Sequence, residues 1–306
     1  MDLQEFLKQR WVIIAVLGIV RLVPPRLGYA IVNLTARRIT KQKPKVYYKL
    51  RKNLAHIPGT DAHPGKLDQL TSQAFYHAVK YYFDFYRMAK RPDHRVKRSV
   101  HIPGEVYDKI KHAQQTGRGV ILAGIHTGNF DLGMVALATD SLMITALSSA
   151  NPNEAYKVQN KLRSKSGLEL LPINPGSLKK ALRLLKNNGI VATGLDWPHP
   201  EETCRINVFG KPAYVPLGTA RLALLSNALT MVVSFYTKPD GNEGVIISDP
   251  IDVIRTGNRE EEIILNTEAY MRIFEEYIQR YPDQWMMFHP FWADEEKSNF
   301  RGEKHV

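Results

Sequence analysis

A histidine and an aspartate, His126 and Asp131, flank a glycine turn near the middle of the chain. The apolar run from Val120 to Ile125 precedes the histidine, and a helical segment begins near Asn129. Open α/β sheets build their sites at the carboxyl ends of strands, and the first turn of a helix favours a carboxylate. A carboxylate that fixes one imidazole nitrogen leaves the other free to take a proton from a hydroxyl. The spacing therefore suggests His126 as a general base and Asp131 as its orienting partner.

From spacing alone a structural interpretation is equally open, because Asn and Asp after a strand are common helix-capping residues. Other chemistries have less support. The only cysteine, Cys204, excludes an intramolecular disulfide framework and a Cys-rich zinc site. The scattered histidines have no metal-ligand spacing, so we expect no metal. The sequence contains no G-x-S-x-G elbow, Walker A loop or dinucleotide fingerprint, which argues against a serine hydrolase, an NTPase and a dehydrogenase.

The elements that must position the pair follow from short apolar runs that alternate with amphipathic stretches after Pro103, a pattern typical of βα units around a sheet. Strands are predicted at residues 120–125, 143–147, 168–173, 190–195, 231–236 and 245–248. Helices are predicted between them at residues 104–115, 129–138, 153–166, 176–187, 217–226 and 260–280. The fold class is therefore α/β, with a central mixed sheet flanked by helices. An aromatic-rich helix over 66–90 precedes it, and its rings at this spacing are expected in the core.

The chain has 306 residues and a net charge of +12, and the excess charge is local. Residues 6–60 contain no acidic side chain and 12 Lys and Arg residues, so the remainder is balanced. The same stretch holds apolar segments from Trp11 to Val20 and from Leu27 to Leu34, separated by Pro24-Pro25. Ten residues are too few to span a bilayer as a helix, which needs about 20. No cleavage site follows them, so a removable signal peptide is not expected.

We therefore expect a division into a basic amphipathic hairpin at residues 1–60 and an α/β catalytic domain at 61–306. The hairpin would lie in a membrane interface with its cations on anionic headgroups. The alternative is a buried helical hairpin with a solvated basic flank. Apolar area and positive charge occur together in one segment, which favours the membrane-interface hairpin over the buried one.

The sequence resembles the bacterial lipid A late acyltransferases and the related phosphatidylinositol mannoside acyltransferases, within the glycerolipid acyltransferase group. The shared mark is a His-x4-Asp motif after an apolar strand, here His126-Thr127-Gly128-Asn129-Phe130-Asp131. Further segments that resemble the family, in the expected order, are 163–167, 189–196, 209–213 with 218–223, and 281–289, which contains Pro282-Asp283-Gln284-Trp285. Together these segments cover nearly the whole chain, and the ordered set is more specific than the short motif alone.

The resemblance implies an O-acyltransferase at the cytoplasmic membrane, peripheral or monotopic, with its active site on the cytoplasmic side. It implies a thioester donor, acyl-CoA or acyl carrier protein, a glycolipid acceptor, and no further cofactor. Attack on the thioester develops an oxyanion that a fixed cation or backbone amides must stabilise. Arg163 is the candidate cation, and the turn amides near Gly128 are the alternative. By resemblance Asp196 and Arg205 would line the acceptor site, with Glu201 as an additional carboxylate.

The sequence departs from the family pattern where the acceptor is expected. The aspartate at 196 is followed by Trp197-Pro198-His199, where relatives often have Gln or Arg, and Pro290-Phe291 replaces the Arg-Arg that often follows the last histidine. Acceptors other than lipid A therefore stay open, including a glycosylated glycerolipid or another sugar hydroxyl.

The rival hypothesis is a non-catalytic lipid-binding or nucleic-acid-binding protein that uses residues 6–60 as a basic arm. Nucleic-acid binding would interleave aromatic and basic side chains on one surface. The aromatic residues instead gather at 75–86, downstream of most of the basic ones. We therefore expect no nucleic-acid partner.

Overall fold

A computed structural model describes residues 18, 20, 22–60, 63–88, 91–138, 142–150, 152, 154–164, 167–197 and 203–293. A six-stranded sheet in the order β3-β2-β4-β1-β7-β8 forms its centre. The strands are β1 (Val120–Gly124), β2 (Ile144–Ser148), β3 (Leu168–Pro172), β4 (Ile190–Gly194), β7 (Leu229–Thr237) and β8 (Glu243–Ile247). All neighbours pair in parallel except β7 and β8, which are antiparallel. The predicted mixed sheet is confirmed, with each strand within two residues of its expected bounds.

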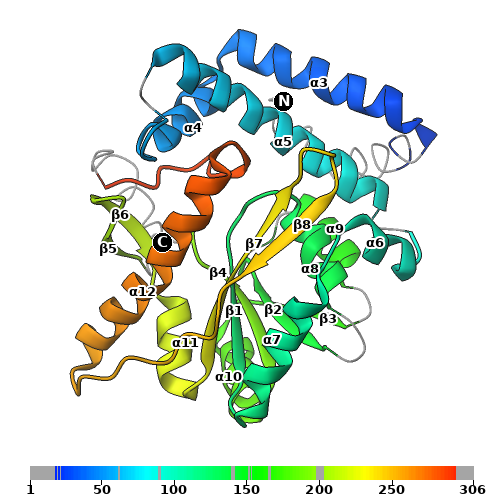
Figure 1. Ribbon diagram of the computed structural model, residues 1–306. Coiled ribbons are helices and arrows are strands. Elements are labelled where there is room, and N and C mark those ends of the chain that lie inside the picture. The colour runs from blue at the N-terminus through cyan, green and yellow to red at the C-terminus, as the bar shows by residue number, and fades with distance from the viewer. Residues whose placement is uncertain are drawn as a thin grey trace.

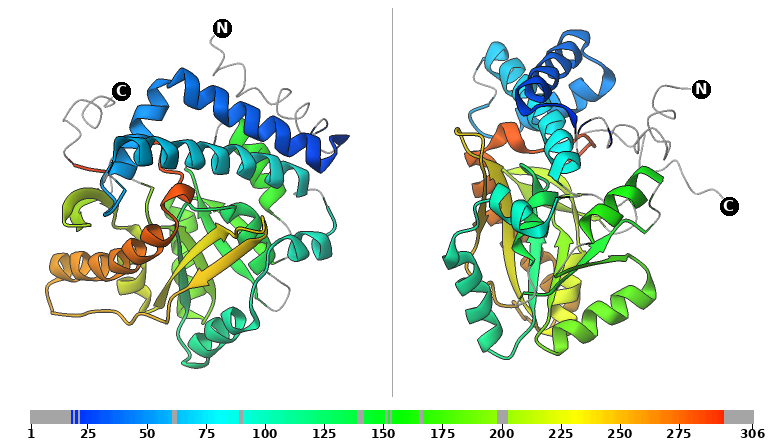
Figure 2. Two further views of the ribbon diagram at one scale, coloured as in Figure 1. Left: turned by 45° about the horizontal axis from the view of Figure 1, so that its top comes forward. Right: turned by 90° about the vertical axis from the view of Figure 1, so that its right-hand side faces the viewer.

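Helices cover both faces of the sheet, as the two views of Figure 2 show. They are α7 (Gly104–Gln115), α8 (Phe130–Leu137), α9 (Glu154–Arg163), α10 (Pro175–Lys186), α11 (Gly218–Ser226) and α12 (Arg259–Arg280). Alternation along β1 separates the faces, because successive side chains of a strand point to opposite sides. Val120 and Leu122 pack with residues of α7, α8 and α9. Ile121 packs with α10 and α11 on the other face.

A two-stranded ribbon, β5 (Thr203–Val208) with β6 (Lys211–Pro216), stands apart from the central sheet. The glycine turn at this place is recognisable in the sequence, but the two strands were not predicted. Phe209 and Gly210 both have positive φ, of 49° and 73°. Two such residues match the right-handed twist of a tight hairpin, so the turn itself determines the antiparallel pairing.

The N-terminal helices α3 (Pro25–Gln42), α4 (Lys45–Ala55) and α5 (Pro64–Met88) lie above the carboxyl ends of the strands (Figure 1). Helix α3 packs on α5 and buries Gly28, Val32 and Ala36. The aromatic residues of α5 are largely buried, as predicted. A small helix, α6 (Asp93–Ser99), leads from α5 to α7.

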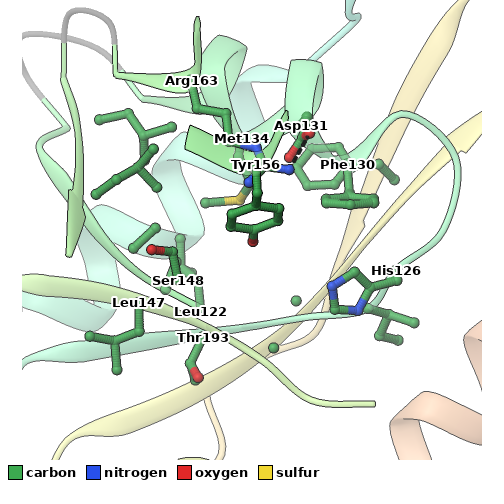
Figure 3. A pocket seen from close by; sticks show the side chains of 18 residues that line it. Leu122, His126, Phe130, Asp131, Met134, Leu147, Ser148, Tyr156, Arg163 and Thr193 are labelled. Carbon is green, nitrogen blue, oxygen red and sulfur yellow. Dashed lines mark hydrogen bonds and ion pairs between the residues drawn. The ribbon is translucent and has the colours of Figure 1, made fainter. Parts of the chain in front are cut away.

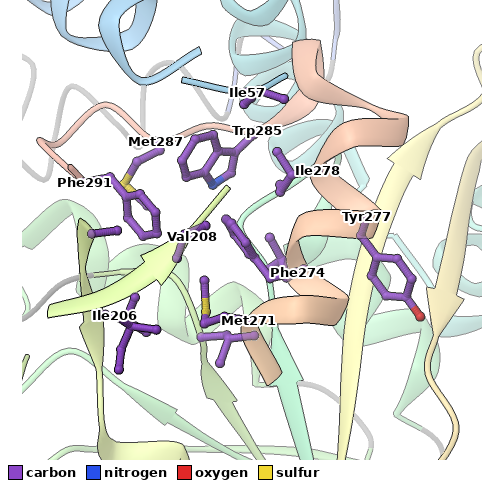
Figure 4. Close-up of a cluster of buried hydrophobic side chains, with 14 of the residues drawn as sticks. Ile57, Ile206, Val208, Met271, Phe274, Tyr277, Ile278, Trp285, Met287 and Phe291 are labelled. Carbon is purple, nitrogen blue, oxygen red and sulfur yellow. The ribbon is translucent and has the colours of Figure 1, made fainter. Parts of the chain in front are cut away.

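Helix α4 belongs to the same apolar core as α12 and the C-terminal segment. Tyr47, Leu50 and Leu54 are fully buried in one cluster with Trp285 and Phe291. Figure 4 shows how Trp285 and Phe291 meet the side chains of α12 in this cluster. This packing fixes the position of the segment that follows the short 3-10 helix η1 (Pro282–Gln284).

The first arm of the expected membrane hairpin, Trp11 to Val20, lies outside the described residues except at positions 18 and 20. The second arm corresponds to α3, which is described in full. In the part of the chain that the structure describes, no helix combines the length and the apolar character needed to cross a bilayer.

Candidate active site

The site begins with the register of β1 and β4, which pair in parallel with Gly124 opposite Gly194. Two residues beyond this pair, the chain reaches His126 from β1 and Asp196 from β4. Their side chains meet: His126 Nδ1 lies 2.6 Å from an Asp196 carboxylate oxygen. A Cβ on Gly194 would lie 3.3 Å from the imidazole ring, so glycine leaves room for it.

The sequence prediction that Asp131 orients His126 is wrong in this geometry. Asp131 accepts hydrogen bonds from the Tyr81 hydroxyl and, at 2.7 Å, from Arg163 Nη2. It is buried with both partners. Helix α8 begins at Phe130, so Asp131 lies on its first turn and its carboxylate faces α9 and α5 instead of the imidazole (Figure 3).

Asp196 is fully buried and held from several sides. Trp285 Nε1 donates to its second oxygen at 2.9 Å, and the backbone N–H of His126 donates to the same oxygen at 3.2 Å. The segment carrying Trp285 also pairs with the histidine loop, since Met286 N donates to the His126 carbonyl at 3.0 Å. The Pro-x-Gln-Trp segment noted in the sequence therefore supports the histidine and its carboxylate together.

The electrostatics favour a histidine that can accept a proton. Burial lowers the pKa of His126, but the charge and hydrogen bond of Asp196 outweigh burial and, with Asp131 adding to them, raise the pKa above its usual value. In the neutral ring, Nδ1–H donates to Asp196 and Nε2 carries the free lone pair. The arrangement is that of an oriented general base.

The turn after His126 is tightly held. Gly128 has a φ of 53°, and a Cβ there would lie 2.6 Å from the Phe235 carbonyl oxygen. Glycine is therefore required at this position for conformation and for space. The amides of Thr127, Gly128 and Asn129 donate to Ile125 O, Gln284 O and Glu243 respectively. These amides already have acceptors within the chain.

A buried charge network, which no pattern in the sequence revealed, supports the same turn. Lys80 Nζ lies 2.7 Å from Asp84 and 2.7 Å from Glu243. Burial lowers the pKa of Lys80, but the two carboxylates outweigh burial and raise it. Tyr29 of α3 donates to Asp84 at 2.9 Å. The network joins α3 and α5 to Glu243, the residue that accepts from Asn129.

An apolar pocket of about 120 Å³ opens beside His126 (Figure 3). It lies among the ends of β1, β2 and β4 and helices α8 and α9. Its walls are mostly apolar, with Arg163, Tyr156 and Asp131 on one side. The Arg163 guanidinium lies 4.7 Å from the centre of the Tyr156 ring, and its Nε is buried with no hydrogen-bond partner in the described structure.

Two predicted acceptor residues are not brought to this site by described contacts. Arg205 is exposed on β5 and does not line the pocket. Glu201 lies outside the described residues. In the described residues, no group of three or more His, Cys, Asp or Glu side chains could hold a metal ion.

Comparison with known proteins identifies the class of this protein over almost the whole chain. Residues 3–294 match the family of bacterial lipid A biosynthesis acyltransferases, and the chain belongs to this family.

Similar proteins include phosphatidylinositol mannoside acyltransferases and lipid A biosynthesis acyltransferases. A phosphatidylinositol mannoside acyltransferase of Mycobacterium tuberculosis is 24% identical over 248 residues, which cover 79% of this chain and 76% of the relative. The protein of that name from Mycolicibacterium smegmatis is also 24% identical and covered over 78% of its length. The lipid A biosynthesis palmitoleoyltransferase of Escherichia coli is 24% identical over 201 residues, 65% of this chain and 63% of the relative.

Proposed function

We propose that this acyltransferase moves a fatty acyl chain from a thioester donor, acyl-CoA or acyl carrier protein, to a hydroxyl of a glycolipid. Examples of such an acceptor are a lipid A precursor and a phosphatidylinositol mannoside. The observation that carries the proposal is a histidine held at Nδ1 by a buried carboxylate while it lines an apolar pocket. The names of the relatives support the acceptor class.

In the proposed reaction, His126 Nε2 takes the proton of the acceptor hydroxyl as the oxygen attacks the thioester carbonyl. The tetrahedral intermediate collapses, the C–S bond breaks, and the imidazolium returns its proton to the leaving thiolate. Asp196 keeps the ring in the required tautomer and stabilises the imidazolium. No acyl-enzyme forms, because the acceptor oxygen attacks the donor directly.

Arg163 is the proposed cation for the oxyanion side of the site. The turn amides near Gly128 are weaker candidates, since each already donates within the chain. Arg163 lines the pocket, and Asp131 fixes its guanidinium at 2.7 Å. A fixed, buried cation acts strongly on developing charge because it needs no reorganisation during the reaction.

The acyl chain of the donor is proposed to occupy the pocket beside His126. Leu122, Met134 and Leu170 line it with other apolar side chains. The aromatic residues of helix α5 do not line this pocket, and most of them pack into the core. Burial of the chain gains about 0.8 kcal/mol for each CH₂ removed from water.

The direct test is a transfer assay. The purified protein is incubated with labelled acyl-CoA or acyl carrier protein and with candidate glycolipids, and the products are identified by mass spectrometry. We expect a labelled ester on the glycolipid from one of the donors. Release of free fatty acid without ester formation on any hydroxyl acceptor would contradict the proposed transfer.

We further propose that α3 seats the enzyme peripherally on the cytoplasmic membrane surface. Leu27, Ile31 and Leu34 are 54%, 49% and 69% exposed, on the side of α3 away from α5. Arg37, Arg38 and Lys41 are also exposed, and they follow Leu34 within two turns of the same helix. Each cation near an anionic surface contributes roughly 1 kcal/mol. The exposed apolar and basic side chains together suit an anionic bilayer.

Replacing Leu27, Ile31 and Leu34 by serine should weaken binding to anionic phosphatidylglycerol-containing vesicles in a sedimentation assay, at unchanged thermal stability. The variant loses the apolar area that would enter the membrane interface. It keeps its thermal stability because the three side chains make no buried contact that the substitutions remove. Leu225→Ser provides the control, because Leu225 is 43% exposed on α11. Equal vesicle binding by the triple variant and the wild type would contradict this membrane face.

A further inference from the structure

An exposed tryptophan lies directly beside the candidate base. Trp197 follows Asp196 in the chain and is 43% exposed. Its ring centre lies 5.3 Å from that of His126 and 4.4 Å from that of His289. The contact with His289 is edge to face, at 64°. Trp197 and His289 together form an aromatic surface beside His126, and the Trp197 indole does not belong to the buried core.

This aromatic surface is separate from the apolar pocket. The described lining of the pocket includes His126 but neither Trp197 nor His289. Direct transfer requires both substrates to meet at one histidine. If the acyl chain fills the pocket, the acceptor must reach His126 by another approach, and Trp197 borders one.

The backbone that carries the second ring, that of His289, is held in place from α4. Asn53 is buried and its side-chain N–H groups donate to the carbonyls of Met287, at 2.8 Å, and His289, at 2.7 Å. Lys49 precedes Asn53 by one helical turn, so both occupy the same side of α4. Lys49 is exposed. The surface thus combines two aromatic rings with a cation nearby.

The charge state of the second ring agrees with this role. Burial, and then the charge of Lys49, lower the pKa of His289 below its usual value. A lowered pKa favours the uncharged ring, which acts as an aromatic face. The positive charge of the surface resides on Lys49.

Such a surface suits a particular ligand chemistry. The face of an aromatic ring is electronegative and its edge electropositive, so an indole face attracts the polarised C–H groups of a flat polyol ring. Exposed hydroxyls of that ring keep their water or reach polar neighbours. An acyclic headgroup presents no such flat face. A cation at the rim suits a phosphate attached to the ring.

We propose that Trp197 and His289 form a stacking subsite for a cyclic polyol headgroup, a sugar or cyclitol ring, whose phosphate lies toward Lys49. This inference rests on the proposed acyl transfer and specifies its acceptor. Trp197 then determines specificity, because it selects a ring over an acyclic headgroup and presents a ring hydroxyl to His126.

The test compares two acceptors that share a phosphate but differ in the ring: phosphatidylinositol mannoside and phosphatidylglycerol, each in mixed micelles. The measured quantity is the ratio of kcat/KM for the two acceptors. In Trp197→Ala this ratio should fall about tenfold, the upper range for one aromatic contact. Trp197→Phe should retain most of the preference, because it keeps an aromatic face. Leu225→Ala, equally exposed but on α11, should leave the ratio unchanged.

A binding measurement separates this inference from the proposed function. Titration with phosphatidylinositol mannoside should change the tryptophan emission of the wild type but not that of Trp197→Phe. Acyl transfer with an unchanged acceptor ratio in Trp197→Ala would overturn the subsite and leave the transferase intact. A Trp197-dependent emission change without any transfer would support the subsite and overturn the proposed acyl transfer. The absence of both signals would overturn both.

Discussion

The His126→Ala protein should lose most of its turnover, on the order of 10²- to 10⁴-fold, the contribution of general-base catalysis. The reason is that His126 Nε2 is the group proposed to take the proton of the attacking hydroxyl. The thioester donor should still bind, since the apolar pocket has many other walls. Steady-state transfer to the glycolipid and equilibrium binding of acyl-CoA separate these two quantities.

A matched control is available on helix α7. His112 is exposed there, so His112→Ala should keep wild-type turnover. A folded His126→Ala protein with wild-type turnover would refute general-base catalysis by this residue. Weak donor binding by the same variant would instead indicate a binding role for His126.

Asp196→Asn should produce the second large loss, also on the order of 10²-fold or more. The amide keeps the shape of the carboxylate, but it no longer fixes the Nδ1–H tautomer or stabilises the imidazolium. Because the two side chains act through one hydrogen bond, the double variant with His126→Ala should be little worse than either single variant. Additive losses would show that the two residues act independently.

Asp131→Asn should behave differently. Asp131 pairs with Arg163 in the interior, so its replacement leaves a buried charge without its partner. Loss of one member of a buried ion pair typically costs about 3–5 kcal/mol of stability. We expect a lower thermal midpoint for Asp131→Asn. Asp196→Asn should act mainly on turnover and should shift the thermal midpoint less than Asp131→Asn does. Equal thermal shifts and equal rates in the two variants would contradict this division of roles.

The pH profile distinguishes the two carboxylates further. The base works only when neutral, so the rate rises with pH through the pKa of His126. Against the effect of burial, the Asp196 carboxylate raises this pKa, which shifts the rising limb to higher pH than for an ordinary histidine. Asp196→Asn removes the main raising influence and should move the limb to lower pH. A limb that stays in place would argue against the contact between Asp196 and the titrating group.

Much of the architecture follows from the sequence by itself. Short apolar runs and amphipathic stretches, interrupted by Gly and Pro, specify the six strands of the central sheet and its flanking helices to within a few residues, but not β5 and β6. The strand-turn-helix around Gly128 is equally local, because the positive φ of the turn favours glycine there. These local patterns are enough to identify His126 as a candidate base.

The partner of His126 does not follow from local patterns. Asp131 is near His126 in sequence, but helix α8 directs its carboxylate toward Arg163 and Tyr81. Asp196 lies 70 residues further along the chain. Its position just after an apolar strand is a usable signal, since His126 stands in the same place after β1. That signal becomes decisive only when β1 and β4 are known to be neighbours.

The neighbours of each strand are decided by the tertiary structure. The order β2-β4-β1 places a later strand between two earlier ones, and local patterns carry no information about which strands pair. Once β4 lies beside β1 in register, residues two positions past each strand meet, and Trp285 closes over them from a third segment. Short-range propensity acts within one element, whereas the pairing of distant strands is determined by how all the apolar faces can be buried together.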